Sequence, residues 1–304
     1  MADPRVPGDL PVVVEQARRP EGQRWLAALP GLLDAAAERW NLSIGVPFPG
    51  GSAAWAGPVR RPDGTEAVLK VTLPHREARH EGEGLRTWDG NGAVFVYEED
   101  PLSYTLLIER CRPGTELKYD PAPAEDRLAV ASQLLTRLWQ QPFSDRAAFE
   151  TVDDVCGDWA ELVRRRMDEL KPPFDPGLVA LGAHLLEALP ASATRRVLVH
   201  GDFNPTNILR AEREPWLAID AKPMVGDPGY DVMPLASEID SRLATHPVPE
   251  ALRRHFELVA SIVAEPSERL LAWAAARTVE AALWHSSLGE HVEGLEAMQW
   301  ARVF

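Results

Sequence analysis

The chain has 304 residues, of which 45% are hydrophobic and 26% charged, a balance typical of globular proteins and unlike that of disordered ones. Its 46 acidic against 32 basic residues give a formal net charge of −14, which disfavours nucleic acid and anionic membranes as partners. This length suggests about two domains, and it suffices for a large core without disulfide bonds.

The first part of the chain predicts a helix and then a small sheet with one helix inserted. Residues 21–40 repeat apolar side chains at helical spacing, with a break or kink expected at Pro30. Two apolar stretches at 52–59 and 66–73 flank a Pro-Asp-Gly turn, a pattern typical of a β-hairpin. Three further elements are expected here, namely a polar helix over 75–88 and strands over 93–97 and 104–109.

The composition changes at residues 112–125, which are rich in proline and charge, and we place the domain boundary there. We expect an N-terminal nucleotide-binding lobe over 1–110, including the first helix, and a C-terminal lobe over 111–304. Apolar stripes at helical spacing predict core-facing helices in the second lobe. These helices are 126–139, 156–170, 178–189 and most of 231–303, with short strands at 197–200, 207–209 and 216–220. The predicted fold class is α+β, a small β-sheet lobe followed by a larger, mainly helical lobe.

The segment that carries chemistry reads VLVHGDFNPTNIL and is followed by WLAID. Asp202 follows an apolar strand, Asn207 comes five residues later, and Asp220 ends an apolar strand thirteen residues after Asn207. Phosphoryl transfer from a nucleotide needs a carboxylate near the acceptor hydroxyl and oxygen ligands that hold Mg²⁺ on the phosphates. Asp and Asn also favour ordinary turns, but the combined spacing favours the catalytic interpretation.

This HGDxxxxN pattern with a later strand-ending Asp resembles the aminoglycoside phosphotransferase-like kinases. The segment AEREPWLAIDAKPMVGDPGYDVMPL resembles more narrowly the streptomycin 6-kinase and hydroxyurea phosphotransferase family. The resemblance covers essentially the whole chain and is most specific over residues 198–235. It implies the two-lobed protein-kinase-like fold, with Asp202 as the catalytic base and Asn207 and Asp220 as the two Mg²⁺ ligands.

Two more residues of this segment are expected to support the site. His200 matches the histidine of the kinase His-Arg-Asp loop, but Gly201 leaves no arginine beside it, so we expect a structural, satisfied core histidine. By resemblance Asp231, in the GDPGYD segment, hydrogen-bonds the backbone near the catalytic loop; alternatively, it caps the next helix. Lys222 could reach a phosphate, but no role is assigned to it.

A kinase-like N-terminal lobe requires a lysine on a strand and a glutamate on the following helix. Lys70 interrupts an apolar strand, which costs free energy unless the ammonium group is paired. By resemblance to the family pattern, Glu81, eleven residues later, is the expected partner, with Glu77 and Glu83 as competitors. The pair would fix Lys70 against the α- and β-phosphates of ATP.

The rest of the nucleotide site is weakly indicated. Gly50, Gly51 and Ser52 precede the hairpin and could cradle a phosphate through their backbone N–H groups, but no GxGxxG is present and an ordinary turn is the alternative. By resemblance the inter-lobe hinge lies at the end of the last strand of this lobe. Backbone groups at Glu109 and Cys111 would there hydrogen-bond the adenine.

The acceptor is expected to be cationic, because streptomycin-like aminocyclitols carry guanidinium groups and other aminoglycosides carry ammonium groups. Such a substrate favours carboxylates placed for charge-assisted hydrogen bonds, and an aromatic face that stacks on a guanidinium. The candidate residues in the helical lobe are Glu238, Asp240, Glu280 and Trp284. The alternative is that these acids are simply solvated helix surface.

We therefore expect an ATP- and Mg-dependent kinase of a hydroxylated small molecule, with an aminocyclitol antibiotic as the first expectation. A hydroxyurea or sugar kinase on the same scaffold is one alternative, and a catalytically inactive kinase-like binding protein is another. The four key polar positions argue against the inactive alternative because all are intact, namely Lys70, Asp202, Asn207 and Asp220.

The sequence also favours a cytoplasmic protein. Its two cysteines lie in no metal-type spacing and form no disulfide framework. The first residues lack the pattern of a signal peptide, and no apolar run is long enough to span a membrane. The sequence makes no prediction of oligomeric state.

Overall fold

The computed structural model describes residues 3–144, 149–245 and 248–304. The chain divides into two compact units. Unit 1 comprises Met1–Gly114 and Arg210–Leu217, and unit 2 comprises Thr115–Leu209 and Ala218–Phe304. None of the described helices is long and apolar enough to cross a membrane.

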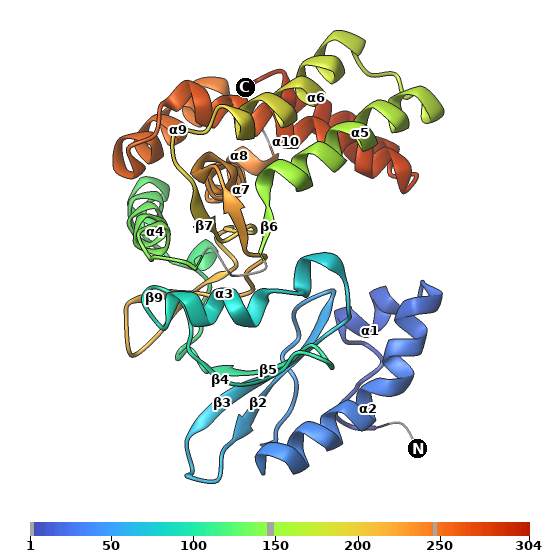
Figure 1. The fold of residues 1–304 in the computed structure, drawn as a ribbon, viewed down its shortest axis with the longest axis vertical. Coiled ribbons are helices and arrows are strands. Elements are labelled where there is room, and N and C mark those ends of the chain that lie inside the picture. Colours follow the sequence, from blue (N-terminus) through green and yellow to red (C-terminus); the bar gives the residue numbers. More distant parts are fainter. Residues whose placement is uncertain (1–2, 145–148, 246–247) are drawn as a thin grey trace. The chain divides into compact units, whose positions relative to one another are not determined.

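Unit 1 is a five-stranded antiparallel sheet with helices packed against it (Figure 1). The strand order is β1-β2-β3-β5-β4. The strands are β1 (Ser43–Ile44), β2 (Ala54–Arg60), β3 (Glu66–Thr72), β4 (Val96–Asp100) and β5 (Thr105–Glu109). The helices are α1 (Pro11–Gln16), α2 (Pro20–Trp40), the 3-10 turn η1 (Arg76–Ala78) and α3 (Glu81–Trp88).

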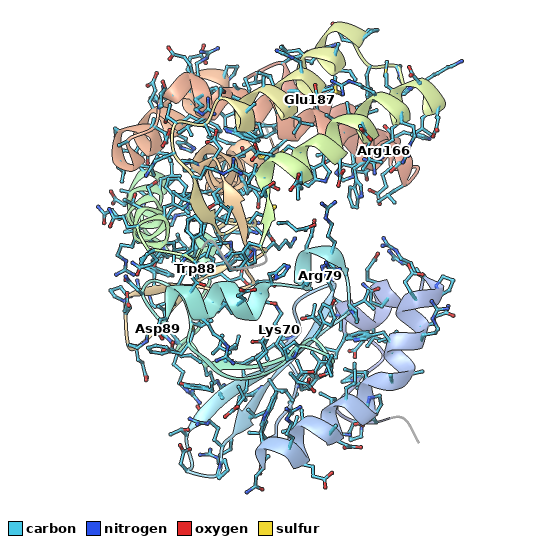
Figure 2. The ribbon with its side chains drawn as sticks, in the orientation of Figure 1. Lys70, Arg79, Trp88, Asp89, Arg166 and Glu187 are labelled. Carbon is cyan, nitrogen blue, oxygen red and sulfur yellow. The ribbon has the colours of Figure 1, made fainter. Side chains whose placement is uncertain are left out.

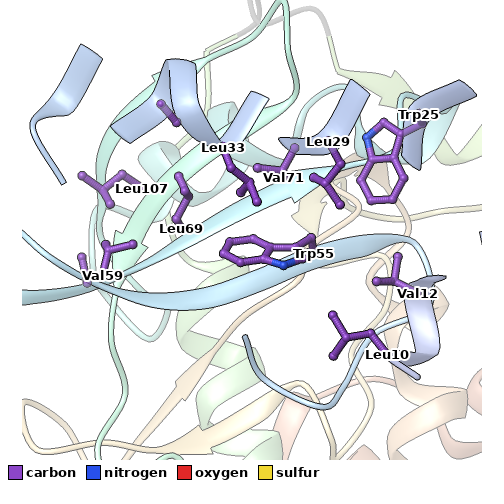
Figure 3. Packing of buried hydrophobic residues seen from close by; sticks show 12 residues of the cluster. Leu10, Val12, Trp25, Leu29, Leu33, Trp55, Val59, Leu69, Val71 and Leu107 are labelled. Carbon is purple, nitrogen blue, oxygen red and sulfur yellow. The ribbon is translucent and has the colours of Figure 1, made fainter. Parts of the chain in front are cut away.

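The core of unit 1 lies between α2 and the β2–β3 hairpin. Trp25, Leu29 and Leu33 recur at helical spacing on α2 and are buried. They meet Trp55 and Leu69 from the two strands, as Figure 3 shows. Because strand side chains alternate between the two faces of a sheet, this packing fixes which residues of β3 face away from α2.

Unit 2 consists of helices around three short strands (Figure 1). Its helices are α4 (Ala124–Trp139), α5 (Val152–Leu170), α6 (Pro176–Ala191), α7 (Val232–Glu238), α8 (Ser241–Thr245), α9 (Pro249–Val263), α10 (Ser267–Ser287) and α11 (His291–Ala301), with 3-10 turns η2 (Leu117–Tyr119) and η3 (Pro228–Asp231). The small sheet has the order β6 (Glu150–Thr151), β10 (Met224–Gly226), β7 (Val197–Val199). A separate pair is formed by β8 (Ile208–Arg210) and β9 (Trp216–Ala218), whose connecting turn belongs to unit 1.

The structure corrects three predictions. Helix α2 continues through Pro30, so a break at this residue is wrong; the buried face of the helix outweighs the missing backbone hydrogen bond. The helix expected over 75–88 begins only at Glu81, after a 3-10 turn. On α6 the predicted leucine stripe is wrong at Leu181, which is 49% exposed, whereas Leu189 is buried as predicted. The buried face of α6 also contains Gly182, which lies against Val279 of α10 too closely for a Cβ atom.

Candidate active site

The loop after β7 is held by a glycine that no other residue can replace. Gly201 has a φ of 84°, in the left-handed region that favours glycine. A Cβ atom built there would overlap the backbone carbonyl oxygen of Lys222. The two segments are also joined by a hydrogen bond of 2.8 Å from the Lys222 N–H to the His200 carbonyl. Residues 200–202 and 220–222 are therefore locked side by side.

The Asp231 carboxylate holds the backbone of this loop by hydrogen bonds. Its Oδ2 accepts hydrogen bonds from the His200 N–H at 2.8 Å and from Trp139 Nε1 at 2.9 Å, and its Oδ1 accepts one from the Gly201 N–H at 2.7 Å. The side chain is fully buried. Burial raises the pKa of its carboxyl group, while His200 and the three donors oppose that rise. Asp231 makes the backbone contacts expected from the resemblance, at the N-terminal end of α7.

His200 is a buried histidine with both ring nitrogens engaged. Nε2 lies 3.0 Å from the Ile219 carbonyl, and Nδ1 lies 3.3 Å from the Asp202 N–H. These contacts fit the tautomer that carries its proton on Nε2. Burial lowers the pKa of the ring, which favours the neutral form despite the nearby acids. His200 thus shapes the backbone on either side of the loop.

Asp202 is partly exposed and receives three cationic or amide groups. Asn204 Nδ2 donates to Oδ1 at 3.1 Å, and Asn207 Nδ2 donates to Oδ2 at 3.3 Å. Lys222 Nζ forms an ion pair with Oδ2 at 3.3 Å. The sequence interpretation missed Asn204; its signal was an Asn two residues after the Asp, which here also accepts from the Thr206 and Asn207 N–H groups as an Asx turn.

Asn207 and Asp220 are brought together by the pairing of β8 with β9. The Asn207 carbonyl accepts the Ile219 N–H at 2.9 Å, so Asp220 follows directly beside it. Asn207 is 8% exposed, and its Nδ2 also donates to the Asp202 carbonyl at 3.0 Å. Asp220 has a φ of 58°, an uncommon backbone conformation in which Asp is enriched and which clusters at functional sites.

The donors at this point fit Mg²⁺ held together with phosphates. Among the described residues there is no group of three or more His, Cys, Asp or Glu that could hold a metal by itself. One carboxylate from Asp220 and one amide oxygen from Asn207 are an incomplete set on their own. Mg²⁺ commonly binds through one or two carboxylates and completes its six ligands with substrate phosphates and water.

In unit 1, Lys70 and Glu81 form a buried ion pair. Lys70 Nζ lies 2.6 Å from Glu81 Oε1, and the two residues are 7% and 3% exposed. Lys70 extends from β3 (Figure 2). Glu81 is the first residue of α3. The competitor Glu83 contacts His80 at 3.2 Å, and Glu77 lies in the turn η1. The structure thus gives Lys70 the partner that the sequence favoured.

The remaining candidates in unit 1 are Ser52, Glu109 and Cys111, and their contact with a nucleotide stays a prediction. Ser52 is exposed before β2, and its carbonyl accepts a hydrogen bond of 2.7 Å from Gln16. The Glu109 carboxylate is occupied by Arg213, with contacts of 2.9 Å to each oxygen, and the Glu109 N–H donates to the Phe95 carbonyl at 2.8 Å. Burial raises the pKa of the Cys111 thiol to about 12, which makes the thiol unreactive.

The four acceptor candidates differ sharply in their surroundings. Asp240 pairs with Arg242 at 2.8 Å, and Glu280 on α10 pairs with Arg166 of α5 at 3.2 Å. Trp284, one turn beyond Glu280, is 43% exposed. Glu238, at the end of α7, is half-buried and has no hydrogen bond or ion pair within the described ranges.

Glu238 also lies within the electrostatic influence of the loop that carries Asp202. Burial raises the pKa of its carboxyl group most, and the negative charge of Asp202 raises it further. Lys118 and Arg277 act in the opposite direction. Of the three acidic candidates, Glu238 is therefore the one that has no ion pair among the described residues and that lies within the electrostatic influence of Asp202.

Comparison with known proteins decides the family. The model of the aminoglycoside/hydroxyurea antibiotic resistance kinases matches residues 39–289. The chain belongs to this family. It is 37% identical to the streptomycin 6-kinase of Streptomyces glaucescens, over 92% of this chain and 90% of that protein. It is 33% identical to the hydroxyurea phosphotransferase of Kitasatospora aureofaciens, over 94% of this chain and 81% of that protein.

Solved structures confirm the kinase-like fold of this antibiotic resistance kinase. The macrolide 2'-phosphotransferase of Brachybacterium faecium superposes with a TM-score of 0.61 at 18% identity, covering 90% of this chain and 98% of that one. A choline kinase from Streptococcus pneumoniae gives 0.62 at 14% identity, covering 89% and 97%. At such identities the likeness shows the fold alone. Family membership makes the protein a phosphotransferase, and its kinase relatives imply a nucleotide substrate.

Proposed function

We propose that the protein transfers the γ-phosphoryl group of ATP, with Mg²⁺, to a hydroxyl of a cationic aminocyclitol antibiotic such as streptomycin. The observation that carries the proposal is the loop in which Asp202 is held beside the Asn207–Asp220 pair. The streptomycin 6-kinases of Streptomyces glaucescens and Streptomyces griseus, at 37% and 33% identity, support the acceptor class.

In the proposed reaction Asp202 accepts the proton of the acceptor hydroxyl. The acceptor oxygen forms a bond to the γ-phosphorus, the bond to the bridging oxygen breaks, and ADP leaves with that oxygen. Lys70, fixed by Glu81, neutralises charge on the α- and β-phosphates. Asn207 and Asp220 would hold Mg²⁺, which when bound supplies positive charge on the phosphates. In this scheme unit 1 binds nucleotide, and unit 2 binds acceptor and carries the base.

The acceptor's positive charge is proposed to meet Glu238. An unpaired, half-buried carboxylate is poorly solvated, so a guanidinium or ammonium group gains a charge-assisted hydrogen bond there at little further desolvation cost. The net charge of −14 also attracts such a substrate over longer distances.

Glu238→Gln should therefore weaken cationic acceptors selectively. We expect KM for streptomycin to rise about tenfold or more, since a hydrogen bond to a charged group contributes about 1.5–3 kcal/mol. The KM for neutral hydroxyurea, where it is a substrate, should stay within about twofold. Steady-state kinetics with both acceptors measure this, with Asp240→Asn in parallel. If Asp240→Asn raises the KM for streptomycin more than Glu238→Gln does, the cation binds at Asp240 instead.

The function itself is tested by Mg-ATP turnover over streptomycin, hydroxyurea and neutral amino-sugar analogues. We expect ADP release that depends on the presence of streptomycin. We also expect mass spectrometry of the reaction mixture to detect phosphorylated streptomycin. Hydroxyurea phosphorylation is the second candidate, because the hydroxyurea phosphotransferase is as similar as the second streptomycin kinase. Thermal stabilisation by Mg-ATP without turnover of any acceptor would instead indicate an inactive, nucleotide-binding protein.

A further inference from the structure

Lys222 faces the proposed base directly. Its Nζ lies 3.3 Å from Asp202 Oδ2, and the two side chains are 34% and 26% exposed. Within the part of the chain that the structure describes, it is the one cation at ion-pair distance from Asp202. The loop itself offers no such charge, because the residue between His200 and Asp202 is Gly201.

The backbone of Lys222 is fixed to the same loop. Its N–H donates to the His200 carbonyl at 2.8 Å, and its own carbonyl lies where a Cβ atom of Gly201 would be. The backbone of Lys222 is therefore held in place beside the loop that carries Asp202. The glycine at 201 thus lets the segment after Asp220 approach closely enough for its lysine to reach the base.

The contacts of Asp202 distinguish its two oxygens. A carboxylate oxygen accepts about two hydrogen bonds. Oδ2 accepts a hydrogen bond from Asn207 Nδ2 and forms the ion pair with Lys222 Nζ, each at 3.3 Å. Among the described residues, Oδ1 accepts one hydrogen bond, from Asn204 Nδ2 at 3.1 Å. Oδ2 is therefore the oxygen that Lys222 engages, and Oδ1 can accept a further hydrogen bond from the acceptor hydroxyl.

We propose that Lys222 is a positioning residue that holds Oδ2 of Asp202, so that Oδ1 is the oxygen that receives the acceptor's proton. The role rests on the proposed function of Asp202 as the base. In this proposal the positive charge beside the base comes from Lys222, two residues after Asp220. Proton transfer requires the base oxygen within hydrogen-bond reach of the hydroxyl, so a rotated carboxylate slows the chemical step and leaves nucleotide binding intact.

A double-mutant cycle tests this role. Lys222→Met should lower kcat about tenfold or more while KM for ATP stays within about twofold, and Lys222→Arg should recover much of the loss. In an Asp202→Asn background, Lys222→Met should cost less than about twofold, because residues that act as a unit are not additive. Lys171→Met, which removes the same charge from an exposed position at the end of α5, should match the wild type.

Two measurements besides turnover complete the test. The melting temperature of Lys222→Met without ligand should stay close to that of the wild type, and its Kd for Mg-ATP, by calorimetry, should be unchanged. A crystal structure of the ligand-free variant should show the Asp202 carboxylate turned away from its wild-type orientation.

The proposal is overturned by an unchanged carboxylate, by equal losses of kcat in both backgrounds, or by a weaker Kd for Mg-ATP, which would place Lys222 on the nucleotide. A wild-type protein inactive on every acceptor refutes the proposed function alone, because the two crystal structures still decide the positioning.

Discussion

Asp202→Ala should lower kcat by about a hundredfold or more, the usual contribution of a positioned general base. The alanine cannot accept the hydroxyl proton, and it loses the contacts with Asn204, Asn207 and Lys222 that orient the Asp202 carboxylate. Because the side chain is partly exposed, water can solvate the donors left behind. The KM for ATP and the thermal stability should therefore change little.

The measurement is single-turnover phosphorylation of streptomycin with wild-type, Asp202→Ala and Asp202→Asn proteins. The asparagine keeps the shape of the Asp202 side chain and one oxygen that accepts hydrogen bonds, but it is not a base. Both variants should therefore be equally slow. Retained turnover in Asp202→Ala would mean that another group takes the proton. A fast Asp202→Asn protein beside a slow Asp202→Ala one would assign Asp202 a purely orienting role.

The sequence was sufficient for the parts of the fold that depend on local patterns. The alternation of apolar residues and the Asp-Gly turn predict the β2–β3 hairpin, and Lys70 stands out there because a charge in an apolar strand needs a partner. The structure supplies that partner, Glu81. Whether Glu81 or Glu83 pairs with Lys70 depends on which face of α3 each residue occupies. The sequence indicated Glu81 only through resemblance to a family.

Contacts between distant segments were not predictable in this way. Strands β6 and β10 are two and three residues long, too short to show a period of two. The inward face of α6 is set by how closely Gly182 approaches Val279, which depends on another helix. The turn between β8 and β9 groups with unit 1, where Arg213 bonds Glu109 and the carbonyls of Gly90 and Ala93.

The candidate site shows the same division. The spacing of Asp202, Asn207 and Asp220 singles them out, since each ends a strand or lies in a tight turn at a fixed separation. The orientation of Asp202 by Lys222 depends on a close backbone approach at Gly201, which no spacing reveals. Likewise, only the structure shows that Asp240 and Glu280 have cationic partners while Glu238 has none among the described residues.

Asp231→Ala should destabilise the protein by about 3 kcal/mol or more and lower kcat with it. The substitution leaves three buried donors without an acceptor, the N–H groups of His200 and Gly201 and the indole of Trp139. Each unsatisfied buried donor costs about 1–3 kcal/mol. Removing the carboxylate also relieves the desolvation that raises its pKa, and this offsets part of the loss.

Urea denaturation of wild-type, Asp231→Ala and Asp231→Asn proteins measures the effect, with Glu169→Ala on the exposed surface of α5 as the control. The asparagine retains one acceptor oxygen but turns an amide N–H₂ toward a donor, so its stability should fall between those of the wild type and the alanine variant. Unchanged stability with lost activity would assign Asp231 to the reaction itself. The Asp231 carboxylate accepts hydrogen bonds from the N–H groups of His200 and Gly201, directly before Asp202. If its role is to hold this backbone, stability and kcat should fall together across the series.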